Sequence, residues 1–142
     1  MEIQPYLFFE GRCEEALDFY AKALGAKVEM KMLYSESPEG GCPAGMPPGT
    51  EKKIMHSAFK IGETTVMASD GMNSGKPDFK GVTLSISMDD EAGVKRVFDA
   101  LSAGGKVVQP LMNTFFSPAF GMVADKFGVP WMVNCTGDVK YE

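Results

Sequence analysis

The chain has 142 residues, a formal net charge of −5 and a pI near 4.9, with 44% hydrophobic and 23% charged residues. This composition is typical of a globular domain and disfavours nucleic acid or an anionic membrane as the main partner. No apolar run approaches the roughly 20 residues of a membrane span, and no signal-peptide pattern opens the chain. Three widely spaced cysteines match no zinc pattern, so we expect a reduced, cytoplasmic protein.

The first half of the chain predicts one helix among four strands. Residues 3–9 are apolar over most of their length, as in a strand covered on both faces. A helix is expected at 13–24, with carboxylates in its early turns and Gly25 just beyond its end. The Gly/Pro-rich residues 36–50 predict a long loop, either plain surface or the wall of a pocket. Three further strands are expected at residues 26–35, 53–61 and 64–69.

The second half predicts the same order of elements. Residues 82–88 alternate apolar and hydroxyl-bearing side chains, which predicts a strand with one apolar face. Asp89 or Asp90 is expected to cap a helix over roughly 91–103. The remaining strands are expected at residues 106–112, 116–124 and 129–135.

The two halves repeat one unit. Three apolar residues of the first helix have apolar counterparts 77 residues later in the second helix. Leu17, Tyr20 and Leu24 correspond to Val94, Val97 and Leu101. The same shift lays the opening strand on residues 80–86. We therefore expect one α+β domain over residues 1–142, with internal modules at about 1–75 and 76–142. A duplicated unit of this kind usually forms its ligand site where the copies face each other.

Several blocks of residues, spread in order along nearly the whole chain, point to one family. They are 5–9, 11–20, 24–26, Cys42-Pro43, Gly45-Met46, Met72 with 74–76, and 125–132. These blocks resemble the PhnB-like branch of the vicinal oxygen chelate superfamily, which includes glyoxalase I, extradiol dioxygenases and bleomycin-resistance proteins. The resemblance implies two βαβββ modules whose curved mixed sheets surround a shared cavity, and commonly a homodimer. Such proteins often carry the label demethylubiquinone methyltransferase, but the sequence has no glycine-rich strand-to-helix turn for a nucleotide-like methyl donor.

Metal-dependent relatives take His, Gln or Glu ligands from the first strand and the last strand of each module. At the matching positions this chain carries Pro5, Val82 or Thr83, and Met132, and Asp70 is the one plausible ligand. A single carboxylate does not hold a catalytic divalent metal. We therefore predict that the cavity contains neither a metal nor another cofactor.

Two residues are candidates for acid–base chemistry. His56 is the sole histidine and could act near neutral pH, although a histidine on a sheet surface or at a subunit contact is the favoured interpretation, since no partner constellation accompanies it. Asp70 falls near the expected cavity mouth, although the following Gly71 also suits an aspartate that forms a turn.

Other residues are candidates for ligand binding. The hydroxyls of the alternating strand are expected to face the cavity, and the aromatic residues offer area for stacking, although solvent exposure and core packing are the respective alternatives. These candidates are Thr83, Ser85, Ser87, Phe115, Phe116 and Trp131.

The sequence thus favours a cytoplasmic homodimer that binds a small polar or aromatic molecule in a metal-free cavity, with no nucleic-acid or membrane partner. Two alternatives stay open. One is a lyase, isomerase or dioxygenase-type enzyme that uses a displaced metal or His56. The other is a protein that sequesters an antibiotic or toxin.

Overall fold

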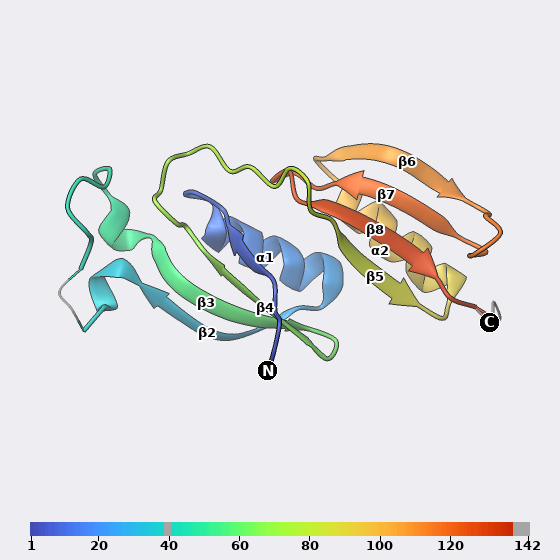
Figure 1. The fold of residues 1–142 in the computed structure, drawn as a ribbon, viewed down its shortest axis with the longest axis horizontal. Coiled ribbons are helices and arrows are strands. Elements are labelled where there is room, and N and C mark those ends of the chain that lie inside the picture. The colour runs from blue at the N-terminus through green and yellow to red at the C-terminus, as the bar shows by residue number, and fades with distance from the viewer. Residues whose placement is uncertain (39–40, 138–142) are drawn as a thin grey trace. The chain divides into compact units, whose positions relative to one another are not determined.

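The structure, a computed structural model, describes residues 1–38 and 41–137. The chain divides into two compact units, Met1–Pro77 and Asp78–Glu142. Each unit contains one α-helix and one four-stranded mixed sheet (Figure 1). No described helix has the length and apolar character needed to cross a membrane.

The first unit holds β1 to β4 and α1. Its sheet has the strand order β1-β4-β3-β2, in which β1 runs parallel to β4 and the other neighbours are antiparallel. Two short 3-10 helices, η1 (Tyr34–Glu36) and η2 (Thr50–Lys52), lie between β2 and β3. The main elements are β1 (Tyr6–Phe8), α1 (Cys13–Leu24), β2 (Lys27–Leu33), β3 (Ile54–Ile61) and β4 (Thr64–Ser69).

The second unit restates this plan with the strand order β5-β8-β7-β6, in which β5 runs parallel to β8. Two modules with the order strand, helix and three strands confirm the predicted α+β fold class. The elements are β5 (Leu84–Met88), α2 (Glu91–Ser102), β6 (Lys106–Met112), β7 (Phe120–Ala124) and β8 (Pro130–Cys135).

The helix predictions are confirmed more closely than the strand predictions. The helix α1 has the predicted ends, and Asp90 caps α2 by accepting a hydrogen bond from the Ala92 N–H at 3.0 Å. The seventh strand begins at Phe120 instead of residue 116. A turn precedes it, in which the Ser117 N–H donates to Thr114 Oγ1 at 3.0 Å, and Pro118 has no N–H to contribute to a strand.

Each helix packs on one face of its own sheet. In the first unit, the buried Tyr20 of α1 stacks on Phe59 of β3, with 5.9 Å between ring centroids. In the second unit, a Cβ at Gly121 of β7 would lie 2.5 Å from Phe98 Cε2 of α2, so only glycine allows this close approach. The opposite face of each sheet is therefore the one that a ligand or another chain can contact.

Candidate functional site

The first sheet has a face turned toward α1 and a face turned away from it, which we call the distal face. Ser57 Oγ lies 3.9 Å from Cys13 Sγ of α1, and Lys31 Nζ donates to Glu14 of α1 at 2.9 Å. Because side chains alternate along a strand, the neighbours His56 and Met32 point to the distal face. These two residues are direct partners across β3 and β2.

An aromatic cluster occupies this distal face. Tyr6 Oη lies 2.8 Å from His56 Nδ1, and the two rings stack with 5.5 Å between centroids. Phe8 lies on the same face of β1, with its ring centroid 4.9 Å from that of Tyr6 and 52% of its surface exposed. Since β4 separates β1 from β3, the Tyr6 side chain reaches across β4 to His56.

Methionines surround the cluster. Tyr6 pairs with Met67 of β4, and Met67 pairs with Ala58 of β3. Ala58 pairs in turn with Met30 of β2, where Met32 is the partner of His56. Methionine is flexible and polarisable, and it adapts to irregular apolar ligands. The part of the distal face around His56 includes Tyr6, Phe8, Met30, Met32, Ala58, Met67 and Ser69.

Asp70 lies in a different environment from His56. Its side chain is 1% exposed, and Oδ1 accepts hydrogen bonds from the N–H groups of Gly11 and Cys13 at 2.9 and 2.8 Å. Oδ2 accepts a third bond from the Ile54 N–H at 2.8 Å. The structure thus uses Asp70 to join the end of β4 to the starts of α1 and β3, and it does not bring the two acid–base candidates together.

The second sheet also has a distal face. Gly121 faces α2, so its neighbour Met122 faces away, together with its partner Met132 and the next residue across, Ser85. Ser87 lies on the same face opposite Asn134, and Thr83 directly precedes β5. Ser85 and Ser87 therefore lie on the side of the second sheet away from α2, as the alternation predicts, whereas Thr83 lies outside the strand.

Asn134 is a further polar residue of this distal face. Among the described residues, its Oδ1 is the one buried side-chain oxygen or nitrogen without a hydrogen-bond partner. A buried amide oxygen is costly to leave unpaired, and a ligand donor would satisfy it.

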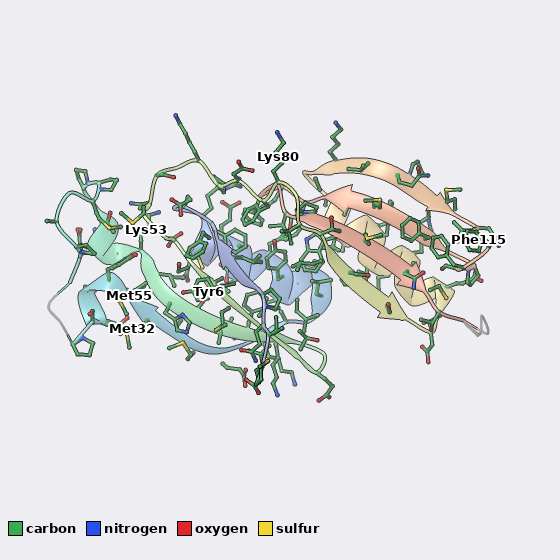
Figure 2. The ribbon with its side chains drawn as sticks, viewed as in Figure 1. Tyr6, Met32, Lys53, Met55, Lys80 and Phe115 are labelled. Atoms are coloured by element: carbon green, nitrogen blue, oxygen red, sulfur yellow. The ribbon has the colours of Figure 1, made fainter. Side chains whose placement is uncertain are left out.

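The three aromatic residues predicted as ligand-binding candidates lie in different environments. Trp131 is 3% exposed on the face toward α2, and its Nε1–H donates to Asp125 Oδ2 at 2.8 Å, so this ring belongs to the core. Phe116 is half-buried and forms an edge contact with Phe120, with 5.2 Å between centroids. Phe115 is 96% exposed and lies in the connection between β6 and β7 (Figure 2).

Within residues 1–38 and 41–137, no three His, Cys, Asp or Glu side chains gather as a metal site requires. Asp70 and His56, the side chains that could serve as metal ligands here, do not form the ligand set that the fold family uses. Both Asp70 oxygens already accept backbone N–H bonds, and His56 Nδ1 is hydrogen-bonded to Tyr6. We therefore derive no chemistry through a metal ion.

Sequence reasoning missed Tyr6 and Asn134 as site residues. The alternation of side chains along the strands could have pointed to both residues. Tyr6 alternates with the buried Leu7, and Asn134 alternates with the buried Val133 and Cys135, so both lie on the face away from the helix. What the sequence did not show is the contact of Tyr6 with His56, because these residues are 50 positions apart.

Comparisons with known proteins agree on one family. Residues 1–134 match the family model described as 3-demethylubiquinone-9 3-methyltransferase. Protein YjdN of Escherichia coli is 40% identical over 141 residues, which covers 94% of this chain and 95% of that protein. The crystal structure of protein PA1353 from Pseudomonas aeruginosa is 39% identical with a TM-score of 0.80, covering 97% of this chain and 99% of that chain.

Two other structures extend the comparison. A putative 3-demethylubiquinone-9 3-methyltransferase, PhnB protein, from Bacillus cereus is 26% identical with a TM-score of 0.75, covering 95% of this chain and 99% of that one. The fosfomycin resistance protein FosX of Mesorhizobium loti is 12% identical with a TM-score of 0.62, covering 98% and 93% of the two chains, and shows the fold alone.

Proposed function

The chain belongs to the PhnB-like family of the vicinal oxygen chelate superfamily, and from this premise we propose that it binds a small polar or aromatic molecule without a metal, as a homodimer. The observation that carries the proposal is the composition of the distal face of the first sheet. That face presents one imidazole and two aromatic rings amid methionines. A mainly apolar surface with a few placed polar groups is typical of a ligand site.

The distal face of the second sheet supplies complementary chemistry. It carries the hydroxyls of Ser85 and Ser87 and the unpaired Oδ1 of Asn134 beside Met122 and Met132. Hydroxyl and amide groups both donate and accept hydrogen bonds. A ligand with polar substituents therefore finds partners on this face as well.

Dimerisation is supported by the edge strands. Both β2 and β6 lie at an edge of their sheets. An edge strand with exposed apolar side chains is a natural surface for a second chain. Exposed apolar residues on these strands are Val28, Met30, Val107, Val108 and Met112.

Methyl transfer is not what we propose, despite the description of the family model. A nucleotide-like methyl donor is usually held by free backbone N–H groups at a strand-to-helix turn. At the turn between β1 and α1, the N–H groups of Gly11 and Cys13 already donate to Asp70. This turn is therefore closed to an anionic or nucleotide-like group.

Thermal unfolding of the purified protein tests the proposal, with a panel of aromatic carboxylates, phenols, polar metabolites and divalent metals. A ligand at 100 times its Kd stabilises the native state by about 2.7 kcal/mol and raises Tm on the order of 10 °C. We expect such a shift with at least one organic compound, and its loss in Met32→Glu, which places a charge on the distal face. The exposed Lys95→Ala is the control that should keep the shift.

Two results would contradict this proposal. Stoichiometric, tightly held Zn, Ni, Mn or Fe in the purified protein would refute the metal-free site. A monomer in sedimentation analysis at micromolar concentration would refute the homodimer.

A further inference from the structure

We propose that Tyr6 positions His56 and fixes its neutral ring as the Nε2–H tautomer, so that His56 presents a hydrogen-bond donor to a planar ligand that carries an acceptor oxygen. This inference rests on the proposed function, because it names the ligand chemistry of the same distal face. Tyr6 is a positioning residue in this arrangement, and His56 is the residue that contacts the ligand.

The geometry restrains the imidazole in two ways. The Tyr6 hydroxyl lies 2.8 Å from Nδ1, which is a good hydrogen-bond distance. The two rings are also stacked, with an interplanar angle of 27°. Together these contacts restrain the plane of the imidazole and its rotation about the Cβ–Cγ bond.

The direction of the hydrogen bond follows from the chemistry of the two groups. A neutral imidazole has one N–H donor and one nitrogen that accepts, and the partner of one nitrogen decides the role of the other. A phenol is a strong donor and a weak acceptor, whereas the imidazole sp² nitrogen is a strong acceptor. Tyr6 Oη–H therefore donates to Nδ1, and the proton of the ring is at Nε2.

The surroundings select the class of ligand. The distal-face side chains around His56 are aromatic rings, methionines, one alanine and one serine, and none of them is acidic. The Ser69 hydroxyl accepts a hydrogen bond from the Gly71 N–H at 3.0 Å. An N–H donor in an apolar, aromatic setting suits a carboxylate, carbonyl or phenolate oxygen on a flat apolar body. None of these side chains around His56 supplies a counter-charge for a cationic ligand.

The tautomer can be measured directly, since the chain has one histidine and every imidazole signal belongs to His56. Protein labelled with ¹⁵N-histidine is studied by long-range ¹H–¹⁵N correlation at alkaline pH. In the unmodified protein we expect Nδ1 at the position of an unprotonated, hydrogen-bonded nitrogen and Nε2 at that of a protonated one. In Tyr6→Phe both resonances should move toward those of a free imidazole.

Tyr34→Phe is the matched control. It also removes one tyrosine hydroxyl from the first unit, but Tyr34 Oη donates to the Gly71 carbonyl at 2.6 Å instead of to His56. The two imidazole resonances should keep their positions in this variant. An Nδ1–H tautomer in the unmodified protein, or unchanged resonances in folded Tyr6→Phe, would overturn the positioning role.

A second arm tests the ligand class with benzoate and benzylamine, which share a phenyl ring but offer an acceptor and a cationic donor respectively. Benzoate should shift the Nε2 resonance. Its affinity should fall about tenfold in Tyr6→Phe, because an imidazole that is no longer held in position forms its charge-assisted hydrogen bond to the carboxylate less often. Benzylamine should leave the Nε2 resonance in place.

The outcomes separate this inference from the proposed function. Benzoate that binds without moving Nε2, or benzylamine that binds as tightly, would overturn the ligand class. A compound from the thermal panel that stabilises the protein while leaving His56 unchanged would support binding and refute the inference. Failure of the whole panel to stabilise the protein would refute the proposed function, whatever the tautomer.

Discussion

The two units share a topology, yet the buried aspartate of each unit works over a different range of sequence. Asp70 joins three elements through N–H groups that lie 59, 57 and 16 residues away in the sequence. Asp125 accepts from the N–H groups of Phe127 and Val129 and from Trp131 Nε1, which lie two, four and six residues away. The first carboxylate therefore holds tertiary structure, whereas the second holds a hairpin turn.

The distal faces differ in a related way. The repeat places Tyr6 and Phe8 of β1 at the positions that Thr83 and Ser85 occupy in the second unit. Phe8 and its counterpart Ser85 both point away from the helix of their unit, so the orientation survived the duplication while the chemistry diverged. One unit offers rings and an imidazole, and the other offers hydroxyls and an amide.

Substitution of Asp70 by alanine should have the largest effect on stability. It leaves three backbone N–H groups without their acceptor, two of them buried and one part-buried, and we expect the free energy of unfolding to fall by about 4 kcal/mol. Urea unfolding measures the loss, and hydrogen exchange should show lost protection at Cys13 and Ile54, which belong to separate elements. Asp78→Ala, at an exposed aspartate, is the control. A loss under about 1 kcal/mol would mean that water replaces these bonds.

Features that depend on contacts between residues close in the sequence could be predicted, whereas features that depend on distant contacts could not. The helix α1 and the cap Asp90 were predictable because periodicity and capping involve residues within a few positions of one another. The first helix has no capping side chain at Arg12, and its N–H groups depend on Asp70 from the far end of β4. No local pattern shows such a partner, so Asp70 was predicted as a turn residue or an acid–base candidate.

Substitution of Asp125 by alanine should have a smaller, local effect. We expect a loss of about 2 kcal/mol, because all three donors lie within six residues of Asp125 and a short turn that includes the exposed Gly128 can rearrange locally to pair them again. Trp131 is the sole tryptophan, so its fluorescence reports the change directly. Loss of exchange protection at Cys13 in Asp125→Ala would contradict the local role.

The sequence predicts on which face of a sheet the candidate side chains lie, but not which of them contact one another. Alternation placed Ser85 and Ser87 away from the helix, and the structure agrees. Alternation also places Trp131 on the other face, together with the buried Val129 and Val133. A ligand-binding role for its ring on the distal face therefore does not agree with the alternation of side chains along β8. Pairs such as Tyr6 with His56 depend on strand order, which the sequence did not specify.

The Cys13 thiol gives the smallest and sharpest test of the comparison, because it lies beside Asp70. Burial, and next the charge of Asp70, raise the pKa of Cys13 from 9.0 to about 12. A raised pKa in the folded state stabilises the protein fully below pH 9, and this contribution is lost as the pH rises from 9 to about 12. We expect stability to fall by about 1 kcal/mol more in the unmodified protein than in Cys13→Ala between pH 9 and pH 10.

Urea unfolding at a series of pH values measures this difference, and the other titrating groups affect both proteins alike. Asp70→Asn sharpens the test, since it removes the charge next to the thiol while leaving the thiol buried. The pKa of Cys13 should then move down, and the fall in stability above pH 9 should become shallower than in the unmodified protein. If unmodified protein and Cys13→Ala lose stability in parallel, the thiol is not held neutral by the first unit. The coupling of Asp70 to the start of α1 would then be confined to its backbone hydrogen bonds.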